Sequence, residues 1–166
     1  VYKRQVEDNV FFGQSAAEKT DASLQAALSL SQAAEFVDKY PEKAAHPIAQ
    51  LGRNVSGGQK QRLSIARALA RTPEILIFDD SFSALDYKTD AVLREGLAKE
   101  LPGTTKIIVA QRISTIRNAD QILVLDRGEI AGLGTHDALM ASCTVYREIA
   151  MSQLSEEELK KGGASK

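Results

Sequence analysis

Two short stretches of the chain carry residue types that could bind or act on a phosphate group. The first is Ser56-Gly57-Gly58-Gln59, which comes directly before a helical run from Leu63 to Arg71. The first N–H groups of a helix have no intrahelical partner and carry partial positive charge, so they attract anions. Glycine lets a phosphate approach the backbone closely, and Ser56 can cap the helix or donate its hydroxyl. An ordinary helix start has the same composition, so this stretch alone leaves both interpretations open.

The second stretch is Asp79-Asp80, which follows the apolar run Ile75-Leu76-Ile77-Phe78. A continuous apolar run predicts a strand of a parallel sheet that is buried on both faces. Ligands of α/β sheets bind at the carboxyl ends of such strands, and carboxylates there are typical of a metal or water site. Because successive side chains of a strand point to opposite faces, Asp79 and Asp80 should have different tasks. An acidic turn after a strand is the alternative interpretation.

The elements before residue 73 are predicted to be mostly helical. Thr20 or Asp21 can cap one helix, and Ser31 can cap the next. A loop over residues 42–54 then leads to a helix over 57–71, whose basic end suits the helix dipole. This region therefore reads as a helical unit that presents the Ser-Gly-Gly stretch at the start of its last helix.

The second half of the chain alternates strands and helices. The expected elements are strands at 75–79 and 106–110, a helix over 87–100 capped by Asp86, a short helical turn at 114–117, a hairpin of 121–125 with 130–133, a helix capped by Thr135, and a last helix over 145–154. We therefore expect a helical region over residues 1–72, an α/β region over 73–154 and a solvated tail over 155–166.

Length and composition limit the possible functions. At 166 residues with 43% hydrophobic content, the chain is long enough for one domain with a core. The formal net charge is −1 with acidic and basic residues interspersed, so no nucleic-acid partner is expected. The single cysteine excludes an internal disulfide, and no apolar run approaches the roughly 18 residues that span a bilayer. We expect the chain itself to be soluble.

Taken with its neighbours, Val55-Ser56-Gly57-Gly58-Gln59 resembles the signature motif of the ATP-binding-cassette (ABC) ATPases. The segment Ile75 to Asp79 resembles the Walker B strand of that family, and Ser83-Ala84-Leu85-Asp86 resembles its D-loop. Ala110-Gln111-Arg112-Ile113-Ser114-Thr115 is similar to the family's switch segment, with Gln111 where the family normally has histidine. Further segments over residues 8–13, 47–52, 119–125 and 132–136 resemble those of ABC exporters. The resemblance covers nearly all of residues 5–150.

The resemblance implies a role for each matched residue. Ser56, Gly57, Gly58 and Gln59 would bind the ATP that a partner domain holds, and the D-loop residues Ser83 and Asp86 would reach toward the partner's site. Asp79 would order the Mg²⁺ of ATP, through water. Asp80 occupies the position of the family's catalytic glutamate, and Gln111 that of its switch histidine. The implied fold is α/β, a partial P-loop NTPase fold: a helical subdomain plus the Walker B and H-loop half of the parallel-sheet core.

One family motif is missing from the sequence. No Gly-x-x-x-x-Gly-Lys-Ser/Thr segment occurs, and the Q-loop glutamine should fall just before Val1. The chain therefore resembles the C-terminal portion of an exporter ATP-binding domain, and alone it should neither bind nor hydrolyse ATP appreciably. Its strand edges should favour self-association.

The altered Asp80 and Gln111 resemble the degenerate-site subunit of heterodimeric exporters. The implied partners are a second ABC ATPase domain and a transmembrane domain, upstream in the same chain or in a separate subunit. The implied location of the full-length protein is the cytoplasmic face of the plasma membrane.

Two other function classes stay open. A chromosome-maintenance or repair ATPase shares the signature motif but would place a long coiled coil inside the domain, and the residues before Walker B show no sustained heptads. A non-catalytic fragment that only binds a partner protein is supported by the missing P-loop motif.

Overall fold

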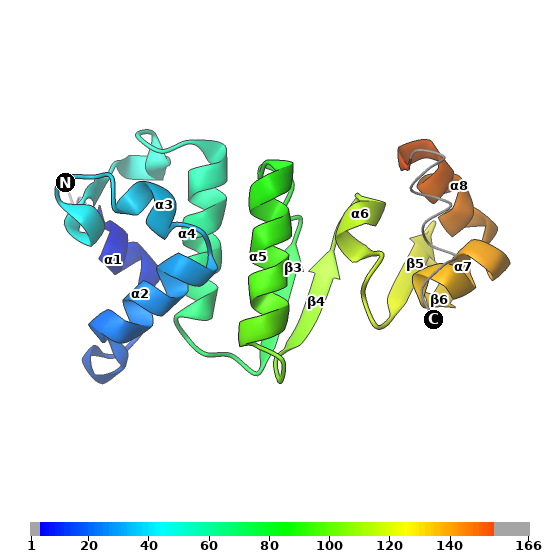
Figure 1. Cartoon of the computed structure of the whole chain (residues 1–166), viewed down its shortest axis with the longest axis horizontal. Helices are drawn as coiled ribbons and strands as arrows, with labels where there is room; N and C mark the ends of the chain where they lie inside the picture. Colours follow the sequence, from blue (N-terminus) through cyan, green and yellow to red (C-terminus); the bar gives the residue numbers. More distant parts are fainter. Residues whose placement is uncertain (1–3, 155–166) are drawn as a thin grey trace. The chain divides into compact units, whose positions relative to one another are not determined.

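The computed structural model describes residues 4–154 (Figure 1), and these divide into two compact units between Ile107 and Ile108. The elements of the first unit are β1 (Arg4–Gln5), α1 (Val6–Val10), η1 (Ala16–Glu18), α2 (Asp21–Leu30), α3 (Ala34–Val37), η2 (Lys43–Ala45), β2 (Pro47–Ile48), η3 (Gln50–Gly52), α4 (Gly57–Leu69), β3 (Ile75–Asp79), α5 (Tyr87–Glu100) and the start of β4 (Thr105–Val109). Those after β4 are α6 (Ile113–Ile116), β5 (Ile122–Asp126), β6 (Glu129–Gly134), α7 (His136–Ser142) and α8 (Thr144–Gln153). The tail predicted over 155–166 lies outside the described residues.

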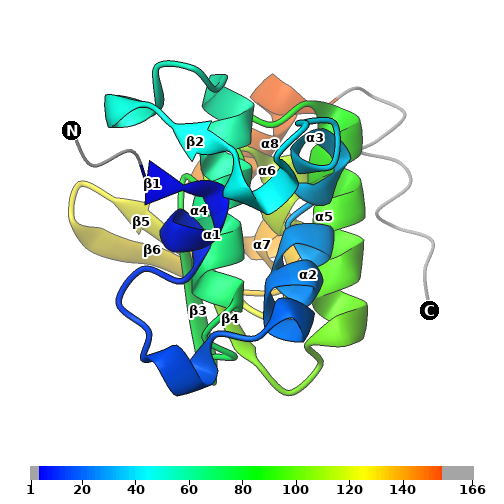
Figure 2. The same ribbon diagram turned by 90° about the vertical axis from the view of Figure 1, so that its left-hand side faces the viewer.

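The helical part of the first unit is built around α4, which contacts both α1 and α2 (Figure 2). The apolar face of α4 is buried, with Leu63, Ile65, Ala66 and Leu69 below a tenth of their possible exposure. This face meets Val6 and Val10 of α1 and Leu24, Ala27 and Leu28 of α2, all of them buried. Each such large side chain contributes roughly 1.5–3 kcal/mol on burial. The core therefore fixes the helix whose first turn carries the Ser-Gly-Gly stretch.

The starts of the short helices follow the predicted caps only in part. The hydroxyl of Thr20 accepts a hydrogen bond from the Ser23 N–H at 3.1 Å, so Thr20 caps α2 as predicted. The prediction that Ser31 caps the next helix is wrong. Ser31 is fully buried at the end of α2, where its hydroxyl donates to the Leu28 carbonyl at 3.1 Å. A serine can bond at either end of a helix, and here its hydroxyl donates to a carbonyl at the C-terminal end that also accepts from the Ala33 N–H at 2.8 Å.

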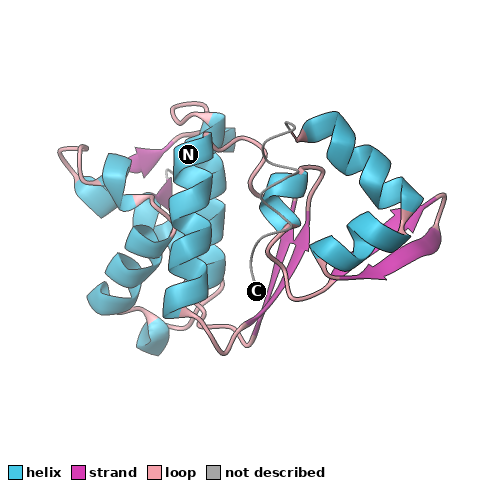
Figure 3. Ribbon diagram, turned by 45° about the vertical axis from the view of Figure 1, so that its right-hand side comes forward, coloured by secondary structure: helices cyan, strands magenta, loops and turns pink. Residues whose placement is uncertain are grey.

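Strand β3 pairs with β4, and Figure 3 shows the pair in magenta with helix α5 in the connection between them. The first bond joins the Thr105 N–H to the Glu74 carbonyl at 2.9 Å. The predicted burial of β3 on both faces is wrong: Leu76 and Phe78 are buried, but Ile75 and Ile77 are 58% and 68% exposed. Alternate side chains point to opposite faces, and only one face of the strand is covered within the described residues.

The second unit contains an antiparallel hairpin of β5 and β6, as predicted. Its turn residues, Arg127 and Gly128, have φ of 51° and 85°, the positive values that a tight two-residue hairpin turn requires. Thr135 caps α7, accepting from the Ala138 N–H at 3.4 Å. At Gly132 a side chain would meet the Leu139 methyl group at 2.8 Å, so α7 packs closely on β6 because residue 132 is glycine.

The core of the second unit joins the hairpin to the last two helices. Its buried members are Ile113, Ile122, Val124, Leu139, Cys143, Tyr146, Ala150 and Leu154. His136 is buried beside this core, with its Nδ1 2.9 Å from the hydroxyl of Tyr146. Burial and the nearby Arg117 lower the pKa of His136, because both disfavour the imidazolium ion.

Among the described residues, no helix is both long and apolar enough to cross a membrane.

Candidate functional site

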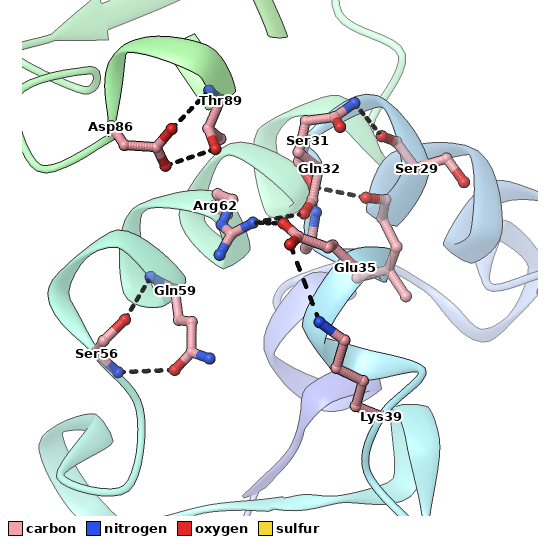
Figure 4. A network of polar contacts seen from close by, with 12 residues as sticks. Ser29, Ser31, Gln32, Glu35, Lys39, Ser56, Gln59, Arg62, Asp86 and Thr89 are labelled. Atoms are coloured by element: carbon pink, nitrogen blue, oxygen red, sulfur yellow. Dashed lines mark hydrogen bonds and ion pairs between the residues drawn. The ribbon is translucent and has the colours of Figure 1, made fainter. Parts of the chain in front are cut away.

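The Ser-Gly-Gly stretch forms the first turn of α4, with Ser56 as its N-cap (Figure 4). The Ser56 hydroxyl accepts from the Gln59 N–H at 3.2 Å, and the Gln59 side-chain oxygen accepts from the Ser56 N–H at 2.8 Å. This reciprocal pair is a capping box. The N–H groups of Gly57 and Gly58 donate to no group within residues 4–154. Two donors and the positive end of a 13-residue helix are therefore free to bind an anion.

The same turn of α4 lies against the loop that follows β3. A Cβ built on Gly58 would stand 3.0 Å from the Ala84 carbonyl oxygen, whereas one on Gly57 would stand 3.9 Å from the Ala84 methyl group. One turn further along α4, the Gln61 side-chain oxygen accepts from the Ala84 N–H at 3.0 Å. The structure thus brings the predicted signature stretch next to the predicted D-loop of the same chain.

The two acids at the end of β3 are both exposed, and their carboxylates form no hydrogen bond or ion pair within the described residues. The solvation cost expected from the sequence is therefore absent, because water reaches both groups. Free carboxylate oxygens are ligands that suit Mg²⁺, either directly or through bound water. No group of three or more His, Cys, Asp or Glu that could hold a metal by itself occurs in residues 4–154. Asp79 would therefore hold Mg²⁺ only together with other ligands, such as phosphate oxygens.

The backbone of Asp80 is held in an unusual conformation. Its φ is 47°, in the left-handed region that costs a non-glycine residue roughly 1–2 kcal/mol. The Asp80 carbonyl accepts from the Ser83 hydroxyl at 3.0 Å, and the Gln61 amide nitrogen lies 3.4 Å from the same oxygen. These contacts hold a turn that directs the chain away from β3 directly after Asp79.

Asp86 closes this turn by capping α5. Its two carboxylate oxygens accept from the Thr89 N–H at 3.0 Å and from the Thr89 hydroxyl at 2.7 Å (Figure 4). These two hydrogen bonds lower the pKa of Asp86, because both stabilise the carboxylate. The bond from the Thr89 hydroxyl has the larger effect on this pKa and the bond from the Thr89 N–H the smaller. The predicted D-loop residue Asp86 thus has a defined task within its own chain, which is to start α5.

Gln111 lies in the second unit, two residues before the start of α6, and is exposed. Its carbonyl accepts from the Gln153 amide at 2.8 Å, while the Gln153 oxygen accepts from the Ile113 N–H at 2.9 Å. One side chain of α8 therefore holds both ends of the Gln111–Ile113 segment. Gln111 therefore belongs to the second unit, whereas the predicted signature, acidic and D-loop residues all belong to the first unit.

One residue of this site had no predicted role of its own. The sequence assigns no task to Gln61, although its side chain contacts Asp80, Ser83 and Ala84. A signal existed in its spacing, since Gln61 follows Gly58 by three residues and the two share one helix face. The partner in the loop, 23 residues later, could not be read from that spacing.

The sequence was compared with those of known proteins, and it matches one family. Residues 2–83 match the profile of the ABC transporter family. An ABC transporter ATP-binding protein of Mycoplasma pneumoniae is 46% identical over 135 residues, which are 81% of this chain and 22% of that protein. The chain belongs to the family of ABC transporter ATP-binding domains. Multidrug resistance protein 4 of Entamoeba histolytica is 39% identical to this ABC domain sequence over 92% of the chain and 12% of that protein.

Among solved structures, a bacterial Atm1-family ABC exporter with ATP bound matches 94% of this chain with a TM-score of 0.87 and 33% identity. The ABC domain sequence described here therefore has the P-loop NTPase-type α/β fold. The match covers 27% of that exporter chain, and this chain spans less than a quarter of each of the two relatives above.

Proposed function

We propose that this ABC domain works in an exporter-type ATPase that couples ATP binding and hydrolysis to the export of a substrate across a membrane. The observation that carries the proposal is the first turn of α4, where Ser56 caps the helix and the N–H groups of Gly57 and Gly58 are free. Its support from known proteins is the likeness to a multidrug resistance protein and to an Atm1-family exporter.

The domain pairs with a second ABC ATPase domain, so that its residues serve two different ATP sites. Ser56, Gly57, Gly58 and Gln59 bind the phosphates of ATP held by the partner, through backbone N–H groups and the Ser56 hydroxyl. Asp79 and Asp80 serve the ATP held on the side of this domain, and Gln111 joins them there. Bound Mg²⁺ supplies charge neutralisation at the phosphates, and Asp79 holds it through water.

The two ATP sites are unequal, which makes the pair a heterodimer. A general base must reach the attacking water within about 2.6–3.2 Å. Asp80 is one methylene shorter than glutamate, roughly 1.5 Å, and a misplacement of about 1 Å costs on the order of 100-fold in rate. Gln111 can donate a hydrogen bond to a γ-phosphate but carries no charge. The site on this domain's side therefore binds ATP and hydrolyses it slowly, while the partner's site turns over.

The full-length protein acts at the cytoplasmic face of the plasma membrane, with a transmembrane domain in the same chain or in a separate subunit. The 166 residues alone, which contain no Gly-x-x-x-x-Gly-Lys-Ser/Thr segment, do not bind ATP appreciably. Titration of this chain with a fluorescent ATP analogue tests that statement, and micromolar Mg²⁺-dependent binding would contradict it.

Steady-state phosphate release from the purified heterodimer tests the assignment of sites. Ser56→Arg fills the phosphate-binding end of α4 and should nearly abolish turnover, because it disables the partner's site. Asp80→Ala should change turnover little, because the site on this side contributes little. Gln25→Arg, which adds the same side chain at an exposed position of α2, is the control. If Asp80→Ala stops turnover while Ser56→Arg retains it, the assignment is wrong.

A further inference from the structure

All the hydrogen bonds of the Gln61 side-chain amide are made to the loop between β3 and α5. Its oxygen accepts from the Ala84 N–H at 3.0 Å, and its nitrogen lies 3.4 Å from both the Asp80 carbonyl and the Ser83 hydroxyl. Within the described residues, no other side chain of α4 donates or accepts a hydrogen bond with this loop. Gln61 is therefore the polar connection between the helix and the loop.

The close approach of the helix also depends on Gly58, three residues earlier on the same face. The Ala84 carbonyl lies where a side chain at residue 58 would stand, so the loop can rest on the helix backbone itself. Both backbone polar groups of Ala84 thus face α4, one against Gly58 and the other bonded to Gln61. These two contacts of Ala84 set the distance between the loop and the first turns of α4.

The loop in turn holds Asp80 in its left-handed conformation. A backbone with φ of 47° at a non-glycine residue persists where the surroundings over-determine it. Three groups donate to the Asp80 carbonyl: the Ser83 hydroxyl at 3.0 Å, the Ser83 N–H at 3.4 Å and the Gln61 amide at 3.4 Å. The Gln61 amide also donates to the Ser83 hydroxyl at 3.4 Å, so this one side chain contacts both the Asp80 carbonyl and a residue that bonds to it.

We infer that Gln61 is a positioning residue that fixes the loop over residues 80–84 against the signature end of α4. Gln61 thereby fixes the position of Asp80 relative to Ser56–Gln59, the residues proposed to bind the partner's ATP. The link between Gln61 and hydrolysis rests on the proposed function; the positioning itself does not.

The test uses the full-length protein with two substitutions of Gln61. Gln61→Met keeps the length of the side chain and removes its hydrogen-bonding groups. Gln61→Glu keeps an acceptor for the Ala84 N–H but presents a carboxylate to the Asp80 carbonyl in place of a donor. Gln25→Met, at an exposed position of α2, is the matched control.

Hydrogen exchange of the peptide over residues 80–86 is measured first, without nucleotide. Gln61→Met should raise the exchange of the Ala84 amide about tenfold, the effect of losing about one hydrogen bond. Gln61→Glu should leave the Ala84 amide protected, and Gln25→Met should change nothing in this peptide. Exchange that stays at the wild-type rate in Gln61→Met, or that rises equally across α2 and α4, would overturn the proposal.

Phosphate release from the same variants follows. Gln61→Glu should lower kcat about tenfold with an unchanged KM for ATP, since Ser83 of the D-loop, which reaches toward the partner's active site, is misplaced while the α4 N–H groups still bind phosphate. A wild-type kcat in both variants would overturn the link to hydrolysis. A rise in exchange in a protein that shows no ATPase activity at all would support the positioning role and overturn the proposed function instead.

Discussion

The Ala84 carbonyl oxygen lies 3.0 Å from the place where a Cβ on Gly58 would stand, while Gly57 has 3.9 Å to its nearest neighbour. Two adjacent glycines of one motif are therefore under different constraints. Gly58 is required by the packing of the loop on α4, whereas Gly57 has room for a methyl group. Within the described residues, nothing in the packing around residue 57 requires glycine.

This difference predicts opposite effects of two matched substitutions on stability. Gly57→Ala should raise the free energy of unfolding, by up to about 1 kcal/mol, because alanine is the better helix former. Gly58→Ala should gain less or lose stability, because the Ala84 backbone must shift. Urea unfolding of both variants measures the difference. Equal changes in the free energy of unfolding would show that the contact at Gly58 is not restrictive.

A second prediction concerns the uncovered face of β3. Ile77 is 68% exposed and Ile75 58% exposed on a strand that has one neighbour among the described residues. Apolar strand surface of this kind favours association with another copy. The isolated chain should therefore form oligomers at high concentration, and Ile77→Lys should reduce them. Light scattering measures the effect, with Tyr87→Lys on α5, also 68% exposed, as the control.

The oligomers would have a different origin if the control reduced them as much as Ile77→Lys did. A wild-type chain that remains a monomer at high concentration would contradict the prediction itself.

A third prediction concerns pH. Burial and Arg117 lower the pKa of His136 in the folded chain, whereas the ordinary value is 6.5. Below that ordinary value the unfolded chain binds a proton that the folded chain does not, so the second unit should lose stability as the pH falls from about 6.5 toward the folded pKa. Asp137 opposes the shift only as its smallest contribution. Above about pH 7 the contribution should be constant, because His136 is then neutral in both states.

Thiol labelling of the buried Cys143, the chain's single cysteine, reports the opening of the second unit. Labelling should accelerate as the pH falls through this window, after correction for the reactivity of a free thiol at each pH. His136→Gln should flatten the dependence, since glutamine can still meet the Tyr146 hydroxyl and does not titrate. A dependence that is unchanged in His136→Gln would assign it to another group.

What the sequence predicted well was local. The helix over 87–100, the hairpin turn at Arg127-Gly128 and the caps Thr20 and Thr135 all depend on residues a few positions apart. Each of these features is determined by neighbouring residues, so intrinsic propensity and capping are enough to predict it.

What the sequence predicted poorly depends on packing. The run Ile75 to Phe78 reads as a strand buried on both faces, but which of its faces is covered depends on elements far away in the chain. Ser31 could cap either helix beside it, and the tertiary burial of its hydroxyl decided the outcome. The contact of Gln61 with Ala84 joins two motifs that the sequence shows separately, and only the fold brings them together.

We propose that the two ATP sites are unequal because of Asp80 and Gln111, and restoring the family's residues at both positions tests this inequality. In the full-length heterodimer, Ser56→Arg silences the partner's site, and Asp80→Glu with Gln111→His is then added. Steady-state phosphate release should be almost absent in Ser56→Arg alone and should rise on the order of 100-fold when both residues are restored. A rate that stays at the level of Ser56→Arg alone would contradict the claim that these two residues make the site slow.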